Sequence, residues 1–110
     1  MTFTATPTIA ETLVKVAPRE THGWTHRSFV LHEMNRTQEA FDLLLPAAER
    51  FPKCWLIPYN LACYCAQLGR LKDAWQWLEK AFALGDSKKV KLMALDDKDL
   101  ETFWADIAEV

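Results

Sequence analysis

The three histidines are the residues whose spacing most directly offers chemistry. His22, His26 and His32 lie in one stretch of helical periodicity, and His22 and His26 are four residues apart. That separation places both imidazoles on the same face of a helix, where they can bind a transition metal with Glu33 or Cys63 as a third ligand. Pairs at this spacing also arise often by chance. A solvent-facing pair is therefore the preferred interpretation, and no metal or other cofactor is expected.

Three cysteines, Cys54, Cys63 and Cys65, are the other candidate ligands and nucleophiles. Their number is odd and two of them fall inside a helical pattern, which favours free thiols in a reducing compartment over a disulfide framework. Cys63 and Cys65 are two residues apart, so on a helix they point to separate sides and do not share an ion. Core packing is the better explanation for at least one of these two, and a thiolate–histidine pair at Cys63 is not expected.

Other chemical signatures point away from catalysis, nucleic acid and membranes. The chain has three glycines and no phosphate loop, nucleophile elbow or zinc-protease motif, so we expect no enzymatic activity. A net charge of −2 gives no reason to expect nucleic acid as a ligand. No apolar run approaches the roughly 20 residues of a membrane helix, and residues 1–8 lack the pattern of a secretion signal. Together with free thiols, these features predict a cytoplasmic protein.

The elements that position these residues follow a sequence repeat. Its period of about 34 residues, built from helical apolar spacing, is typical of stacked helix–turn–helix units. Such units bury one face against their neighbours and present another to partners. The positions that recur at this step are Pro18, Pro52 and Asp86; Leu13, Ala47 and Ala81; Ala10, Leu44 and Leu78; Ala40 and Ala74; and Asn35-Arg36 and Gly69-Arg70.

Prolines, glycines and capping residues delimit the predicted helices at 7–17, 21–34, 37–51, 55–68, 71–84, 87–95 and 97–109. Thr37 is expected to cap its helix, and Asn35 and Gly69 to close the preceding helices in a left-handed conformation. Pro46 is expected to kink the helix 37–51. An apolar stripe in the last helix predicts a lid over the end of the array: Leu100, Phe103, Trp104 and Ile107. The fold class is therefore all-α.

Residues 55–88 resemble a tetratricopeptide repeat: Pro58-Tyr59-Asn60-Leu61-Ala62-Cys63-Tyr64 is followed by Gln67-Leu68-Gly69-Arg70, Asp73-Ala74, Leu78-Glu79-Lys80-Ala81 and Leu84. Residues 21–54 are similar in register, with Arg27 and Ser28 in place of the family's usual leucine and small residue. Residues 6–18 match only the second helix of a preceding unit, and residues 89–110 resemble the capping helices that end such arrays. The resemblance implies a single domain, 1–110, built as a right-handed α-solenoid with C-terminal capping helices.

The family's groove-lining positions imply a peptide-binding surface on the first helix of each pair. Aromatic rings and neutral amides in this set suit a short peptide. Some family members clamp a C-terminal carboxylate with lysine, arginine and asparagine side chains; Asn60 alone matches that set, so this ligand is not expected. Besides Leu56 and Ala66, the implied groove comprises His22, Thr25, His26, Phe29, His32, Glu33, Tyr59, Asn60, Cys63 and Gln67.

The resemblance thus implies a non-catalytic adaptor or scaffold that binds a protein or peptide partner. Two alternatives remain open. Apolar residues of the helix 7–17, among them Ile9 and Leu13, can instead form the surface of a homodimer, and the histidine pair can hold a metal or small ligand. Trp75 and Trp77 are two residues apart and are not expected both to face the core. One of them is therefore expected at the surface or under the lid.

Overall fold

The computed structural model describes residues 19–110, and this part of the chain is helical without any strand. The elements are α2 (Arg19–Glu33), α3 (Thr37–Arg50), α4 (Leu56–Gln67), α5 (Leu71–Leu84), α6 (Ser87–Leu95), the 3₁₀ helix η2 (Lys98–Phe103) and α7 (Trp104–Ala108). The all-α expectation is confirmed for these residues. The predicted helix 7–17 and the partial repeat 6–18 lie outside the described residues.

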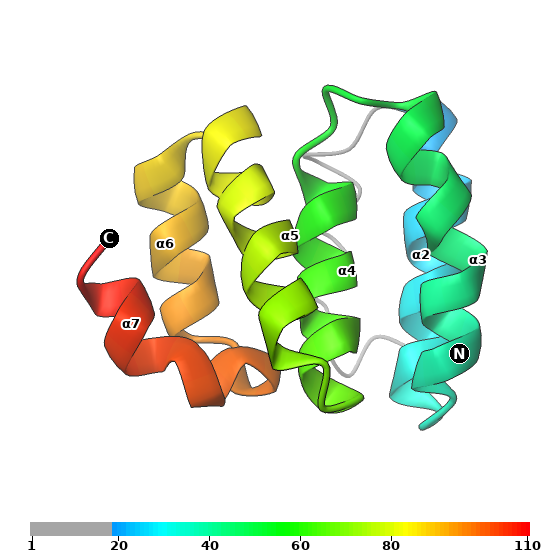
Figure 1. Ribbon diagram of the computed structural model, residues 1–110. Coiled ribbons are helices and arrows are strands. Elements are labelled where there is room, and N and C mark those ends of the chain that lie inside the picture. Colours follow the sequence, from blue (N-terminus) through cyan, green and yellow to red (C-terminus); the bar gives the residue numbers. More distant parts are fainter. Residues whose placement is uncertain (1–18) are drawn as a thin grey trace.

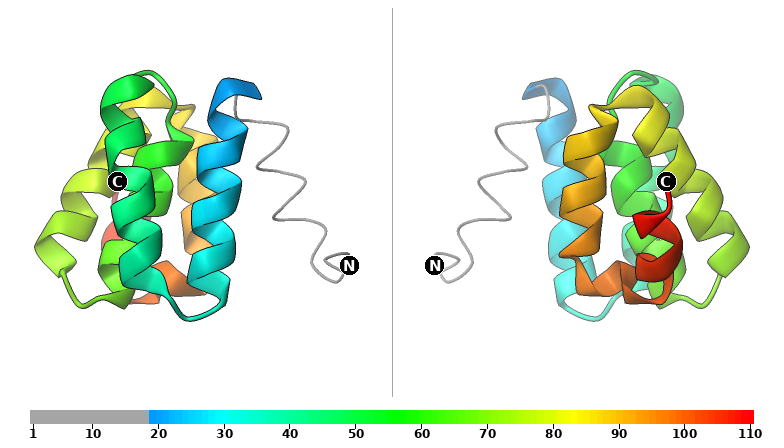
Figure 2. Two further views of the ribbon diagram at one scale, coloured as in Figure 1. Left: turned by 90° about the vertical axis from the view of Figure 1, so that its right-hand side faces the viewer. Right: turned by 90° about the vertical axis from the view of Figure 1, so that its left-hand side faces the viewer.

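The helices pack side by side in a compact stack (Figure 1). α2 pairs with α3 and α4 pairs with α5, and α6 packs against α5. Seen along the stack, α2 and α6 lie on one side and α3 and α5 on the other (Figure 2). η2 runs across the helix ends at which the α2–α3 and α4–α5 turns also lie, and α7 packs beside α6 (Figure 1). The predicted helix 97–109 is divided in two, because Lys98–Phe103 form a 3₁₀ helix with Asp97 as its N-cap.

The apolar positions that recur from one repeat to the next form the core between the paired helices. Ala40 and Ala74, Leu44 and Leu78, and Ala47 and Ala81 all have 0% of their surface exposed. Alanine at the first and last of these positions lets neighbouring helices approach closely, and leucine fills the space between them. α3 continues through Pro46, whose side chain is exposed.

The turns that close α2 and α4 have the same geometry. Asn35 has φ 63° and Gly69 has φ 79°, the left-handed conformation expected for both. Behind each of them the next amide bonds back five residues, from Arg36 to the Leu31 carbonyl and from Arg70 to the Cys65 carbonyl, both at 2.9 Å. These bonds satisfy carbonyls that the helix end leaves free. The repeat is therefore visible in the backbone as well as in the core.

The C-terminal stripe packs as a lid. Leu100 and Ile107 are fully buried and Phe103 nearly so, and the Trp104 indole donates a 3.0 Å hydrogen bond to the Ala94 carbonyl. Trp75 lies against Phe103, with ring centroids 5.6 Å apart. Trp75 is thus the tryptophan of α5 that the lid covers.

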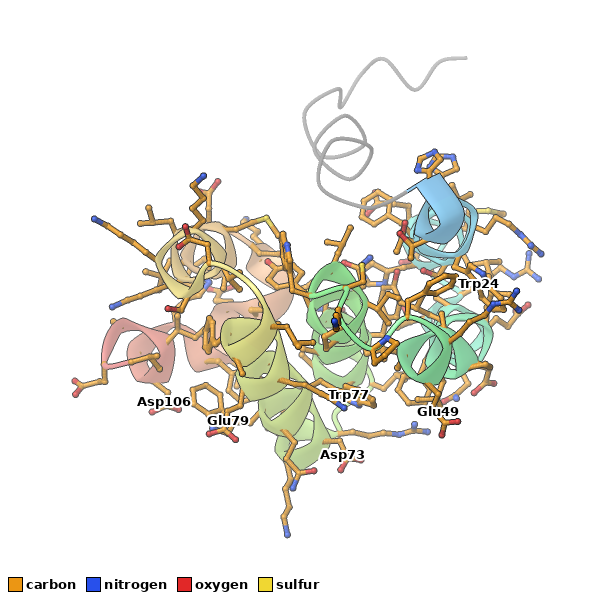
Figure 3. The ribbon with its side chains drawn as sticks, turned by 90° about the horizontal axis from the view of Figure 1, so that it is seen from above. Trp24, Glu49, Asp73, Trp77, Glu79 and Asp106 are labelled. Carbon is orange, nitrogen blue, oxygen red and sulfur yellow. The ribbon has the colours of Figure 1, made fainter. Side chains whose placement is uncertain are left out.

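Trp77 faces a different environment from Trp75. It lies on the side of the molecule that carries Glu49, Asp73 and Glu79, and the Lys80 ammonium sits 5.4 Å from its ring centroid (Figure 3). Trp24, by contrast, extends between α2 and α3 (Figure 3). The two tryptophans of α5 therefore have separate surroundings, as their spacing predicts.

α4 is the central helix. It contacts α2, α3, α5 and η2, and every residue from Leu56 to Cys65 is buried. Its apolar composition agrees with this enclosure. No helix within residues 19–110 is long and apolar enough to cross a bilayer.

Candidate functional site

The peptide-binding groove implied by the resemblance, called the inner wall below, lies on α2 and α4, and its residues differ greatly in accessibility. Thr25, His32, Tyr59, Asn60 and Cys63 are buried. His22, His26 and Phe29 are half-buried, whereas Glu33 and Gln67 are exposed. The expected open groove is therefore not open along its whole length.

The protein's own C-terminal segment covers the wall at α4. The Tyr59 hydroxyl donates a 2.8 Å hydrogen bond to Asp97 Oδ2, and the Cys63 thiol points to the same oxygen at 3.6 Å. His32 Nε2 lies 2.7 Å from Asp99 Oδ2. The expectation that Tyr59, Cys63 and His32 line free space is corrected here, because the segment that leads into η2 occupies that space.

A second part of the wall is used in packing α2 against α4. The Thr25 hydroxyl bonds to the carbonyls of Thr21 and His22, both at 3.2 Å, so it turns back onto its own helix. The Ser28 hydroxyl lies 3.0 Å from the Tyr64 hydroxyl across the helix interface. Ser28, which differs from the small residue expected from the resemblance, is buried and paired with Tyr64.

His22 and His26 share a face of α2, as their spacing predicts. Their rings stack with centroids 5.4 Å apart and an interplanar angle of 28°. Among the described residues the side chains that could jointly hold an ion are Cys63, Asp97 and Asp99, and this group includes neither histidine of the pair. Cys63 therefore belongs with the C-terminal acids and not with His22 and His26.

The polar cluster at α4 has electrostatics set by burial. Burial lowers the pKa of His32, but the hydrogen bond and charge of Asp99 outweigh it and raise that pKa above its usual 6.5. Burial raises the pKa of Asp97, while the bond from Tyr59 opposes the shift. Burial also raises the pKa of Cys63 and that of Tyr59 well above their usual values. The thiol is thus neutral near pH 7, unlike an activated nucleophile.

All three cysteines are free and buried. Free thiols agree with the expectation from their odd number. Cys65, two residues from Cys63 on α4, is fully buried and lies outside the polar cluster. The two thiols therefore point to separate surroundings, as their spacing predicts.

An open pocket lies at the helix ends that carry the α2–α3 turn, next to the exposed Gln67. It has a volume of about 400 Å³ and lies between the α2–α3 turn and the last residues of α4. Arg70 donates to the Gln38 side chain at 2.9 Å across one edge of it. The exposed Met34 precedes the turn. The pocket is lined by Asn35, Arg36, Thr37, Gln38, Glu39, Gln67 and Leu68.

Two polar residues around the site have roles that the sequence did not predict. Thr37 was expected to cap α3, but the helix has no side-chain cap and Thr37 Oγ1 instead lies 3.0 Å from His32 Nδ1. Asp97 does cap η2, accepting the Asp99 amide at 3.1 Å, but its other oxygen contacts α4. The sequence feature that could have indicated the contact with α4 is the acid pair Asp96-Asp97 shortly before the apolar stripe, but it does not predict which residue Asp97 contacts.

Comparison of the chain with models of known protein families, with curated proteins and with solved structures found no match.

Proposed function

We propose that the chain is a short right-handed solenoid of the tetratricopeptide type that acts as a non-catalytic protein-interaction module. The repeated register supports the first half of this proposal. Equivalent positions of the two repeats share full burial at Ala40 and Ala74 and a left-handed backbone at Asn35 and Gly69. Equivalent packing in successive helix pairs is the basis of a solenoid.

The observation that carries the binding proposal is the open pocket at the end of the inner wall. It combines the side-chain amides of Asn35, Gln38 and Gln67 with the guanidinium of Arg36, which the exposed Glu39 carboxylate holds at 2.8 Å from its Nε. Side-chain amides donate to and accept from a peptide backbone. A segment of a partner protein with free backbone groups is the ligand that suits these residues best.

The buried part of the implied groove has a different part in this proposal. Tyr59 and Cys63 bond to Asp97, so they hold the C-terminal segment and do not contact the partner. Replacing Tyr59 would therefore disturb the lid as well as any binding surface. Gln67 and Glu33 are the implied groove residues that remain accessible enough to touch another chain.

A photo-crosslinking amino acid at position 67 tests the proposal. We expect a discrete adduct in native lysate, and we expect Arg36→Ala combined with Gln38→Ala to weaken it. The matched control carries the crosslinker at Glu79, which is exposed on the side of α5 that faces away from α2 (Figure 3). Equal adducts at positions 67 and 79, or none at position 67, would contradict the pocket as the binding surface.

The same experiment separates a partner from a second copy. An adduct of twice the chain mass would favour the homodimer, and sedimentation at several concentrations would then show a mass that rises with concentration. Ile9 and Leu13, implied in that alternative, lie outside the described residues.

A further inference from the structure

Three separate segments bring four metal-ligand side chains together at the end of α4. Cys63 comes from α4, His32 from the end of α2, and Asp97 and Asp99 from the entrance to η2. The thiol and a carboxylate oxygen of each aspartate all lie within 4.8 Å of one another. His32 Nε2 lies 2.7 Å from Asp99 Oδ2 but outside this group of three, so it would have to move toward the thiol to share an ion with them. We propose that this cluster is a zinc site, with Cys63, His32, Asp97 and Asp99 as its ligands.

One pair of donor atoms already has the spacing of a tetrahedral ion, and His32 would shift to complete the site. With Zn–S of about 2.3 Å and Zn–O of about 2.0 Å, a tetrahedral site separates sulfur and oxygen by about 3.5 Å. Cys63 Sγ and Asp97 Oδ2 are 3.6 Å apart. His32 Nε2 and Asp99 Oδ2 are closer than two ligands of one ion, because they share a hydrogen bond. An ion between them would replace that bond and move them apart by roughly half an ångström.

Neighbouring side chains support the ligands as the outer shell of a metal site does. Thr37 Oγ1 lies 3.0 Å from His32 Nδ1, so the imidazole can donate Nδ1–H to it and turn a free Nε2 lone pair toward the ion. The Tyr59 hydroxyl donates to Asp97 Oδ2 and holds that carboxylate in place. Both ligands are thus oriented before an ion arrives.

The charge of the cluster also favours a cation. Asp97 and Asp99 lie together beside a buried thiol, and no lysine or arginine within residues 19–110 forms an ion pair with either. Their cationic contact is His32. Half-buried carboxylates need a compensating charge, which Zn²⁺ supplies. On binding, the thiol proton and any proton on His32 Nε2 pass to water, and the sulfur and nitrogen lone pairs bind the metal.

The site has a path to solvent and a structural consequence. The Asp99 side chain is 29% exposed, so an ion can enter beside it. Once bound, the ion would join α2, α4 and the start of η2 through a single centre. Its role is therefore to fasten the C-terminal segment to the inner wall.

Cobalt(II) titration of the full chain, freed of metal by a chelator, tests the proposal. We expect one equivalent of Co²⁺ to give the ultraviolet charge-transfer band of a cobalt–thiolate bond, and Zn²⁺ to displace it and raise the thermal midpoint. Cys63→Ser should abolish the band. Asp97→Asn should weaken Co²⁺ affinity at least tenfold, because loss of an outer-shell partner alone costs about 10–100-fold and Asp97 is a direct ligand.

Matched controls use the same residue types elsewhere. Cys65→Ser removes a buried thiol two residues along the same helix, and His26→Gln removes an imidazole of α2; both should keep the band and the thermal shift. If circular dichroism shows that Cys63→Ser is unfolded, His32→Gln replaces it as the test variant and should weaken Co²⁺ binding at least tenfold. A parent without band or thermal shift overturns the site, as does a band that survives Cys63→Ser or disappears with Cys65→Ser.

Discussion

The helix pairs α2–α3 and α4–α5 are alike in the buried residues of their second helices, α3 and α5, and differ in those of their first, α2 and α4. In α3 and α5 the alanine–leucine–alanine positions Ala40, Leu44, Ala47 and their counterparts one repeat later are all fully buried. In α2 the buried positions Thr21, Thr25 and Ser28 carry hydroxyls. One repeat later the equivalent positions are Trp55, directly before α4, and Tyr59 and Ala62 within it.

The environment of the two first helices accounts for this difference. α4 lies between α2, α3, α5 and η2, so ten consecutive residues are buried and no polar face is needed. α2 packs on α3 and α4; its Thr25 hydroxyl bonds to a carbonyl of the same helix, and its Ser28 hydroxyl bonds to such a carbonyl and to Tyr64. The same alanine and leucine positions thus form the contact within each helix pair, while the elements packed around the first helix account for its different composition.

The largest expected effects test whether the second helices are equivalent. Leu44→Ala and Leu78→Ala each leave a cavity at a fully buried position, and each should cost about 2–5 kcal/mol. A domain of this size has about 5–15 kcal/mol in total, so both variants should show much lower urea midpoints. A cost near zero for one of them would show that the two pairs do not share a register.

Overpacking the helix crossings should have a smaller effect. Ala40→Leu and Ala74→Leu insert three carbons where no surface is exposed, and each should cost about 1–3 kcal/mol. Ala83→Leu, on an exposed position of α5, is the matched control and should stay within about 0.5 kcal/mol of the parent. Urea unfolding measures all three, and equal costs at positions 74 and 83 would refute the close crossing.

The two turns offer a finer comparison. Gly69→Ala should cost about 1–2 kcal/mol because the residue has φ 79°, and the added methyl has open space, so the cost is conformational. Asn35→Gly should be neutral or slightly stabilising at the equivalent turn, since glycine adopts φ 63° without strain. Thermal unfolding measures both. Destabilisation by Asn35→Gly would show that the Asn35 side chain contributes more than its backbone conformation.

The smallest expected effect concerns reactivity on the enclosed helix α4. Burial raises the pKa of Cys65 to about 11, so at pH 8 only about one thiol in a thousand is ionised. Iodoacetamide should therefore label Cys65 slowly at neutral pH, faster as the pH approaches 11, and rapidly at pH 8 once urea unfolds the chain. Peptide mass spectrometry follows the label. Rapid labelling of the folded protein at pH 8 would mean that α4 is more open than the structure indicates.

Features that depend on local spacing were predictable from the sequence. The helices predicted at 71–84 and 87–95 have the observed bounds, and those predicted at 37–51 and 55–68 differ from the observed ends by no more than one residue. The buried alanines at 40 and 74 and the left-handed turns at 35 and 69 also follow from periodicity and residue type. The 3₁₀ start of the last predicted helix did not, because helical spacing does not distinguish a 3₁₀ turn from an α turn over six residues.

The covering of the inner wall was not predictable, because it depends on contacts between distant residues. Tyr59 and Asp97 are 38 residues apart, and His32 and Asp99 are 67 apart. A tyrosine or histidine on a helix face is compatible with solvent, a ligand or another part of the chain, and nothing near it in the sequence chooses among these. The register of the resemblance placed the wall, but the docking of the C-terminal segment determines which residues remain accessible.

The same segment also limits where a further helix pair could be inserted among the described helices. Its aspartates reach His32 on α2 and Tyr59 on α4, while Trp104, a few residues later, is bonded to α6. A duplicated pair inserted after residue 86 would displace α6 by a full unit, and so short a connection would not span the added width. A helix pair added at this point would therefore break the polar contacts that hold the C-terminal segment against α2 and α4.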